Sequence, residues 1–412
     1  MYFPIFKLHG WGKRFAAQPQ TIYSEIPKHK EDLNMKRTLS ILLALCLLLT
    51  VFAGCGKAQS APQTTAPATV PDTAESTAAE TLPAETTPET REFTDSTGRT
   101  VTVPYEITSI AVTGPLTQVY ILPLAGDMLA GVSNGFADSA AVYLPDYVTQ
   151  LPELGQLYGG KGEMDLEALL AAAPDVVIDV GEAKKTMVED LDALTEQTGI
   201  PFLHIDATVA TAPDAYRLLG SLLGREEKAE ELASWCETTY NRTAAMMEKV
   251  DADNARRPLL YCLGDKGVNV LAEGSFHAET VNMMGRNLAV LEEVVSSGNG
   301  NEVDLEQILA WNPEYIVFAP DSCYSEVSNL PEWQSVEAIS TGHYYETPYG
   351  PYGWLSSPPA VQRYLGILWL GALLYPEYVD YDLQEEVTVY YKLFYDCDLT
   401  DEMYQALIEN AM

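Results

Sequence analysis

The chain has 412 residues and carries 24 Lys and Arg against 59 Asp and Glu, which gives a formal net charge of −35 at pH 7. This length exceeds that of a single ordinary core and accommodates two lobes. A general nucleic-acid binder needs a basic surface, so the charge excludes that class of function. The charge says little about the fold or about the chemistry of a local site.

The N-terminal region, residues 1–55, has the pattern of an export signal. A basic segment at residues 35–37 precedes an apolar run at residues 39–53, and Cys55 follows shortly after. This pattern is typical of a signal peptide rather than of a membrane span. An uncleaved anchor helix is the alternative, for which the apolar run is short. We interpret residues 1–34 as a mistaken upstream start.

Residues 56–91 are rich in Thr, Ala, Pro and Glu. Such a segment cannot bury a core, so it is predicted to be a disordered, flexible tether. Beyond it the chain has four widely spaced cysteines with no Cys-x-x-Cys motif. Outside the cell they could pair, with a connectivity that the sequence does not give, or they could be single buried thiols. They are Cys236, Cys262, Cys323 and Cys397.

Residues 92–224 are predicted to form an N-terminal lobe. Short hydrophobic strands alternate with helical stretches there, which indicates a parallel sheet with right-handed crossovers. The predicted strands are Thr100–Pro104, Ile107–Val112, Leu129–Val132, Val176–Val180 and Phe202–Ile205, and the predicted helices are Thr117–Ala125 and Lys184–Thr198.

Residues 251–412 repeat the scheme and are predicted to form a C-terminal lobe. The predicted strands are Pro258–Leu263, Tyr315–Phe318 and Tyr344–Glu346, and the predicted helices are Ala278–Met284, Ala360–Leu374, Gln384–Tyr395 and Asp401–Glu409.

A long helix is predicted between the lobes, at residues 225–250. The segment contains no Pro or Gly, and its apolar and small residues recur every three or four positions along one face. The segments that begin at Asp165 and Asp304 align without a gap: each reads Asp-Leu-Glu, an apolar helical turn, Pro, an acid and a hydrophobic strand. The predicted fold is therefore α/β, with two similar lobes that contain parallel-type sheets flanked by helices and are joined by one long interlobe helix.

Taken in order, these features resemble a known family. Cys55 after small residues resembles a bacterial lipobox, and the segment from Gly274 to Asn287 resembles a further family element. With the tether, the paired segments and the long helix, they are similar to the substrate-binding lipoproteins of ABC importers for iron–siderophore, haem and cobalamin. The resemblance covers about residues 92–412.

The resemblance implies a function and a location. The ligand, a metal chelate, would bind in the cleft between the lobes, and the protein would deliver it to an ABC permease and its ATPase without catalysing a reaction. Acylation of Cys55 would anchor the protein to the outer face of the cell membrane. We expect a monomer with no cofactor and no nucleic-acid partner. A molybdate- or tungstate-binding protein of the same fold is the alternative.

The resemblance also implies that Glu167 and Glu306 dock on basic residues of the permease. Each lies in the first turn of a predicted helix, where the helix macrodipole favours a carboxylate. The alternative is that both only stabilise the helix ends.

The candidate ligand-binding residues lie in three places. Tyr158 lies in the Gly-rich segment 155–162, and His277 lies where the second lobe is expected to meet the cleft. A Pro-rich stretch dense in aromatic residues would hold rings rigidly against a bulky ligand, or would simply pack against the last helices. Arg363 could meet an anionic ligand or pair with an acid. The aromatic candidates of the Pro-rich stretch are Tyr349, Tyr352 and Trp354.

Three other chemistries have partial signals in the sequence. The segment 155–162 nearly spells a phosphate-binding loop, but Gly162 replaces the Ser or Thr that would hold Mg²⁺. Ser133 lies in a Gly-x-Ser-x-Gly motif, which leaves an exported serine hydrolase as an alternative, although no convincing helix follows. The histidines lie far apart, so no metal site made by the protein itself is expected.

Overall fold

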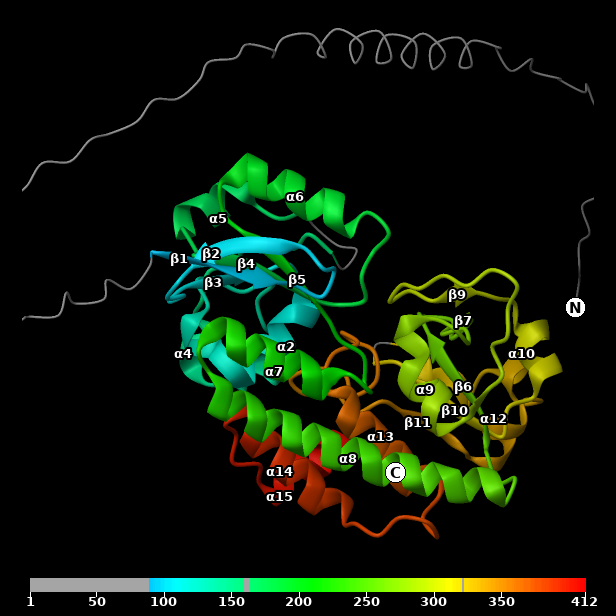
Figure 1. The fold of residues 1–412 in the computed structure, drawn as a ribbon. Helices are drawn as coiled ribbons and strands as arrows, with labels where there is room; N and C mark the ends of the chain where they lie inside the picture. The colour runs from blue at the N-terminus through cyan, green and yellow to red at the C-terminus, as the bar shows by residue number, and fades with distance from the viewer. Residues whose placement is uncertain (1–88, 159–162, 321) are drawn as a thin grey trace, which may run out of the picture. The chain divides into compact units, whose positions relative to one another are not determined.

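The computed structural model describes residues 89–158, 163–320 and 322–412, which belong to one compact unit, Pro83–Met412 (Figure 1). The expected signal sequence, Cys55, nearly all of the tether and Gly162 lie outside the described residues. Within the described part, no helix is long and apolar enough to cross a membrane.

The first lobe contains a hairpin and a parallel sheet. Strands β1 (Thr90–Thr94) and β2 (Thr100–Pro104) pair antiparallel, and β3 (Ile110–Val112), β4 (Val176–Gly181) and β5 (Phe202–Asp206) form a parallel sheet in that order. All six residues of β4 are buried, as expected of a parallel strand covered on both faces. The helices are α2 (Pro115–Ala125), η1 (Gly126–Met128), α3 (Asp138–Ala141), α4 (Asp146–Thr149), α5 (Leu166–Ala172), α6 (Met187–Thr198) and α7 (Ala212–Leu223).

The second lobe is built on a mixed sheet of order β11-β10-β6-β7-β9, with β8 also paired to β6. The pairs β10–β11, β10–β6 and β6–β8 are parallel, and β7 pairs antiparallel with β6 and β9. The strands are β6 (Pro258–Leu263), β7 (Asn269–Val270), β8 (Arg286–Asn287), β9 (Asn301–Glu302), β10 (Tyr315–Phe318) and β11 (Tyr344–Glu346). The helices are η2 (Phe276–Ala278), α9 (Glu279–Met284), α10 (Leu305–Trp311), α11 (Tyr324–Val327), η3 (Pro331–Trp333) and α12 (Glu337–Thr341).

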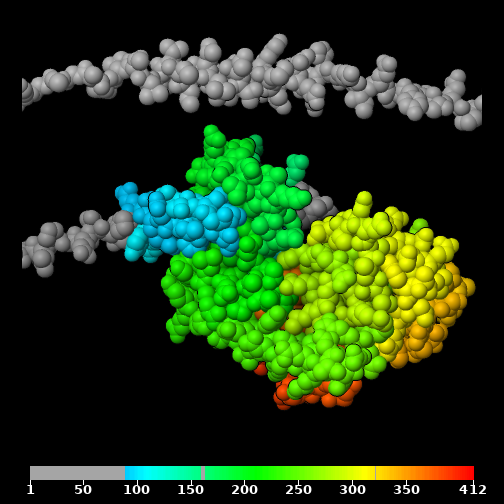
Figure 2. Space-filling view, turned by 45° about the vertical axis from the view of Figure 1, so that its right-hand side comes forward, coloured from blue at the N-terminus to red at the C-terminus, as the bar shows by residue number. Residues whose placement is uncertain are grey.

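The long helix α8 (Glu226–Ala252) runs beneath both lobes (Figure 1). Its 27 residues correspond to about 40 Å of helix at 1.5 Å per residue. This arrangement confirms the predicted fold class of two α/β lobes joined by one long helix. In space-filling view the lobes lie side by side, and atoms in the orange colour of residues near 350 are visible between them (Figure 2).

The last three helices cross back under the first lobe. They are α13 (Arg363–Leu374), α14 (Leu383–Tyr395) and α15 (Asp401–Ile408). Helix α14 packs on α2, and its Tyr391 ring contacts that of Tyr143 in the first lobe at 5.4 Å between centroids. We therefore call the described residues up to 224 lobe 1 and residues 258–346 lobe 2, and α8 and α13–α15 belong to neither.

The two Asp-Leu-Glu segments fold in the same way. Asp165 caps α5 by accepting hydrogen bonds from the Glu167 and Ala168 amides, and Asp304 caps α10 by accepting one from the Gln307 amide. Both helices end in a left-handed residue before the Pro, with φ 47° at Ala173 and 45° at Asn312. The strands β4 and β10 follow.

Two predicted strands of lobe 1 differ in the structure. The prediction of a strand at Leu129–Val132 is wrong, because the two ends form isolated bridges to different partners, Ile110 and Glu153. The strand predicted at Ile107–Val112 begins only at Ile110, because the carboxylate of Asp175 accepts the amides of the two preceding residues, at 2.7 and 3.0 Å. Those amides are therefore not available to the sheet.

Candidate functional site

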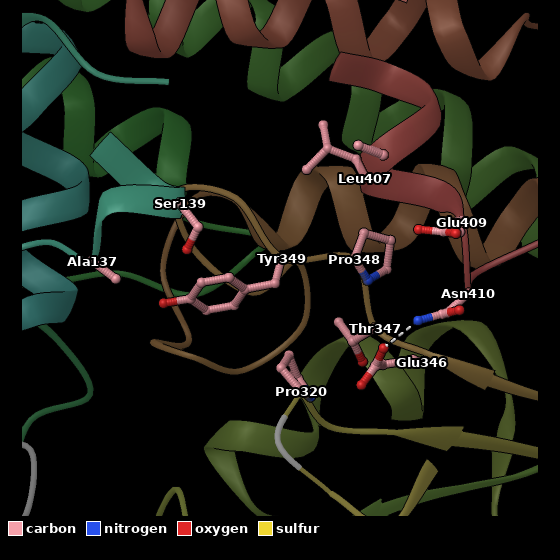
Figure 3. Close-up of a pocket in the computed structure, with 11 residues that line it drawn as sticks. Ala137, Ser139, Pro320, Glu346, Thr347, Pro348, Tyr349, Leu407, Glu409 and Asn410 are labelled. Atoms are coloured by element: carbon pink, nitrogen blue, oxygen red, sulfur yellow. Dashed lines mark hydrogen bonds between the residues drawn. The ribbon is translucent and has the colours of Figure 1, made fainter. Parts of the chain in front are cut away.

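A pocket of about 450 Å³ lies where the two lobes and α15 meet (Figure 3). Lobe 1 contributes Ala137 and Ser139, and lobe 2 contributes residues at the carboxyl ends of β10 and β11, including Pro320 and Glu346. Ligands of open α/β sheets bind outside the carboxyl ends of the strands, so this edge is the expected place for a binding site. We call this cavity the interlobe pocket.

The loop that follows β11, residues 347–359, contributes an aromatic residue, Tyr349, to the lining of the pocket. The Tyr349 side chain points from this loop toward Ala137 and Ser139 and is 46% exposed (Figure 3). Tyr352 and Trp354 lie in the same loop but are buried. Of the three aromatic candidates in this loop, only Tyr349 therefore lines the pocket.

The same loop is anchored to its surroundings. The Gln118 amide of lobe 1 donates to the Tyr352 hydroxyl at 3.1 Å, and the Phe136 ring contacts the Tyr352 ring at 6.2 Å between centroids. The Tyr391 hydroxyl of α14 donates to the Gly350 carbonyl. Tyr349 is thus presented on a loop that is held from two sides, which lowers the entropy lost when a ligand binds.

Ser133 belongs to the same polar network. Its amide and its hydroxyl both donate to Gln118 Oε1, at 2.8 and 3.0 Å. His204, the histidine of lobe 1, is instead bonded to Asp179 at 2.7 Å and to Asp206 at 3.0 Å. Within the described part of the chain the Ser133 hydroxyl therefore bonds to an amide rather than to a histidine, which is not the arrangement of an activated nucleophile.

Arg363 lies in a second, buried contact between the lobes. Its guanidinium is fully buried, with Nη1 2.7 Å from Glu279 Oε2 and the group 4.6 Å from the centroid of the Phe276 ring. The other oxygen of Glu279 accepts the Val209 amide of lobe 1 at 2.9 Å, and the Tyr364 hydroxyl donates to the Val209 carbonyl at 2.6 Å. We call this group of residues the interlobe junction. In the structure Arg363 pairs with an acid.

His277 lies beside the junction, on the lobe 2 side. Burial, together with the positive charges of Arg363 and of Lys184 from lobe 1, lowers the pKa of His277 to about 4. The imidazole is therefore neutral near pH 7. His277 and Arg363 do not line the interlobe pocket.

Tyr158 is half-buried in lobe 1. Burial, and then the charges of Asp179 and Asp190, raise the pKa of Tyr158 above its usual value. Its hydroxyl contacts the sulfur of Met187 at 3.6 Å. Tyr158 does not line the interlobe pocket.

The family model for periplasmic binding proteins matches residues 124–349, more than half of the chain. The chain belongs to this family. An ABC transporter solute-binding protein from Sulfurospirillum deleyianum is 26% identical, with a TM-score of 0.71, and the match covers 77% of this chain and 99% of that one. The resemblance seen in the sequence is confirmed. No curated protein matches the sequence significantly.

Two further solved structures share the fold. A periplasmic solute-binding protein from Veillonella parvula is 24% identical, with a TM-score of 0.62 over 78% of this chain and 98% of that one. The molybdate-binding MolA of Haemophilus influenzae is 21% identical, with a TM-score of 0.61. The match covers 75% of this chain and 99% of that one. The protein is thus an extracytoplasmic solute-binding protein of an ABC importer, and its family consists of transport proteins rather than enzymes.

In this solute-binding protein Glu167 and Glu306 are both exposed. They occupy equivalent positions in the first turns of α5 and α10, one on each lobe (Figure 1). Their side chains are therefore accessible to a partner.

Several residues that line the pocket were not predicted from the sequence as ligand-binding residues. Glu346 ends a predicted strand, so its place at the carboxyl edge of the sheet was a signal that could have been used. Glu409 and Asn410 carry no such signal, because they reach the pocket only through the packing of α15.

Proposed function

We propose that this protein captures a metal chelate, an iron–siderophore, haem or a corrinoid, in the interlobe pocket and delivers it to an ABC permease. The observation that carries this proposal is the pocket itself, with the exposed ring of Tyr349 on an anchored loop. Its volume of about 450 Å³ falls within the range of about 300–1,000 Å³ typical of small-molecule sites. A bare oxyanion such as molybdate would fill only a small part of it.

The proposal includes a membrane anchor. Acylation of Cys55 would hold the protein at the outer face of the membrane, with residues 56–91 as the tether. The ligand-binding part would comprise residues 92–224, the helix at 225–250 and residues 251–412, and would act as a monomer. Mass spectrometry of the membrane-extracted protein tests the anchor: a diacylated peptide that begins at Cys55 is expected, and an unmodified Cys55 in the mature protein would contradict it.

A ligand panel tests the cargo. The mature protein is heated alone and with ferric siderophores, haem, cobalamin or molybdate. A ligand at a hundred times its dissociation constant adds about 2.7 kcal/mol of stability, which raises the melting temperature by several degrees. A shift with one chelate class supports the proposal. A shift with molybdate alone would replace it by oxyanion transport.

Docking is proposed at Glu167 and Glu306. The double variant Glu167→Arg, Glu306→Arg should keep ligand affinity and lose uptake, because two carboxylates that meet basic permease residues become repulsive. The matched control is Glu196→Arg, Glu332→Arg, which places the same charge change on exposed sites of each lobe. Normal uptake by the first variant, or equal loss in both, would remove the docking assignment.

A further inference from the structure

The charged groups of the interlobe pocket all have one sign. Glu346 and Glu409 are carboxylates, and none of the described residues that line the pocket is Lys, Arg or His. The buried cation at the interlobe junction, Arg363, is already paired with Glu279, and His277 is neutral near pH 7. An anionic ligand would therefore meet two negative charges and no lining positive one.

The hydrogen-bond donors of the pocket are largely used within the fold. The Asn410 amide donates to Glu346 Oε2 at 2.8 Å, and the Glu346 backbone amide donates to the Asn410 carbonyl at 2.9 Å. The Thr347 amide and hydroxyl both donate to the Phe318 carbonyl, at 2.9 and 3.0 Å. An oxyanion binds through several converging donors, and these four are already engaged.

Carboxylate acceptors of the pocket, in contrast, are not all engaged within the fold. In the described part of the chain no hydrogen bond engages Glu346 Oε1 or the carboxylate of Glu409. The hydroxyl of Ser139 can donate or accept, so it does not favour either kind of ligand. The pocket thus has an excess of acceptors, which matches a ligand rich in N–H donors or positive charge.

The carboxylate of Glu346 and the loop that carries Tyr349 are also held in place. Asn410 fixes Glu346 through the side-chain and backbone bonds just described, and the next carbonyl, that of Ala411, accepts the Trp369 indole N–H at 2.8 Å. Tyr349 is half-exposed, and the face of an aromatic ring carries the negative side of its quadrupole, which attracts a cation. A ring on an anchored loop and a carboxylate held by Asn410, both lining one pocket, are preorganised for positive charge.

We propose, on the basis of the proposed function, that the solute is cationic: a metal chelate with a pendant ammonium or net positive charge, which binds in the interlobe pocket lined by Tyr349, Glu346 and Glu409. Oxyanions and anionic chelates are the ligands that this pocket disfavours.

A matched pair of chelates tests the charge. Ferrioxamine B carries a pendant ammonium, and its N-acetylated form is neutral but otherwise the same. Calorimetric titration of the mature protein should show at least roughly tenfold tighter binding of the cation, since a factor of ten corresponds to about 1.4 kcal/mol. Raising the salt concentration should reduce the difference. An equal or higher affinity for the neutral form, for an anionic catecholate chelate or for molybdate would overturn the inference.

The variant Glu346→Gln, Glu409→Gln should abolish the preference for the cation. The control Glu196→Gln, Glu332→Gln removes the same charge elsewhere on the surface and should retain the preference for the cation. Persistence of the preference in the first variant, or its loss in both, would show that the pocket carboxylates do not select the ligand.

A second series separates this inference from the proposed function. If no chelate of any charge binds, the proposed function fails. The pocket is then probed by comparing the melting temperature of the protein with benzyltrimethylammonium and with benzenesulfonate. A shift with the cation alone, absent in Glu346→Gln, Glu409→Gln, still supports a cationic solute. A shift with the anion, or with neither, contradicts it.

Discussion

The two lobes meet through two regions of opposite character. At the interlobe junction the charges are matched: the buried Arg363 pairs with the partly buried Glu279, whose other carboxylate oxygen accepts the Val209 amide. At the interlobe pocket the carboxylates of Glu346 and Glu409 are accessible and have no cation among the described lining residues. A buried charge must be matched within the fold, whereas an accessible charge can be left for a ligand. This difference distinguishes the contact that holds the lobes together from the pocket in which we propose that the solute binds.

The largest expected effect is at Arg363. Replacing Arg363 by Ala leaves Glu279 partly buried without its cation, and breaking such a pair costs about 3–5 kcal/mol of unfolding free energy. Urea denaturation of the wild type and of Arg363→Ala measures this loss of unfolding free energy. The control is Lys392→Ala, which breaks the exposed pairs of Lys392 with Asp396 and Asp398 and should cost far less, because water screens exposed ion pairs. Equal losses would show that the junction is not the stabilising contact.

A smaller effect is expected from pH at His277. Its pKa in the fold is about 4, below its usual 6.5, so the native state binds fewer protons than the unfolded state between these values. Stability from the neutral imidazole is present above pH 6.5 and is lost as the pH falls toward 4, by the order of 2 kcal/mol. His277→Gln should remove this loss.

The pH experiment compares wild type with His277→Gln, because His204 acts in the opposite direction. Burial lowers the pKa of His204, but the hydrogen bonds and charges of Asp179 and Asp206 outweigh burial and raise it. The stability that protonated His204 contributes is fully present at low pH and is lost as the pH rises through the raised pKa of His204. Urea midpoints at pH 7, 5.5 and 4.5 give the difference, and parallel curves for the two proteins would refute the role of His277.

Tyr352→Phe should cost about 1 kcal/mol. The change removes the hydroxyl that accepts from the buried Gln118 amide and leaves that donor unpaired. The matched control is Tyr378→Phe, which removes a hydroxyl bonded to Asp253 at the surface and should cost less. If the two variants are equally stable, the link between the loop and lobe 1 does not contribute to stability.

The smallest effect on stability is expected at the pocket. Glu409 is exposed, so Glu409→Gln should change the unfolding free energy by less than about 0.5 kcal/mol. The same variant should weaken binding of a cationic chelate. A large loss of stability would mean that the pocket carboxylate is part of the fold, and the distinction from the junction would disappear.

The parts of the fold that the sequence predicts best are those that depend on local contacts. The segments that begin at Asp165 and Asp304 are examples, because the cap, the helix and the left-handed end all lie within about ten residues. The wrong strand at Leu129–Val132 arose because its two ends pair with residues far apart in the sequence.

The site was harder to predict for the same reason. The sequence left open whether Arg363 meets a ligand or an acid, because Glu279 becomes its neighbour only when α9 packs on α13. Glu409 and Asn410 reach the pocket through α15, more than 60 residues after Glu346. Tyr349 was among the predicted residues because aromatic residues in a Pro-rich stretch are a local signal, but the same signal also selected Tyr352 and Trp354, which are buried. The place of Tyr349 in the pocket is tertiary information.

The continuity of α8 has a consequence for how the protein would report a bound solute. Its 27 residues contain no Gly or Pro, so no position offers an easy hinge, and a wide rotation of the lobes would have to break backbone hydrogen bonds of the helix. Single-molecule fluorescence between dyes on the two lobes should then show one distance population that narrows and shifts slightly with ligand, rather than an exchange between two. The permease would have to distinguish loaded from empty protein by a change in stiffness more than by a change in shape.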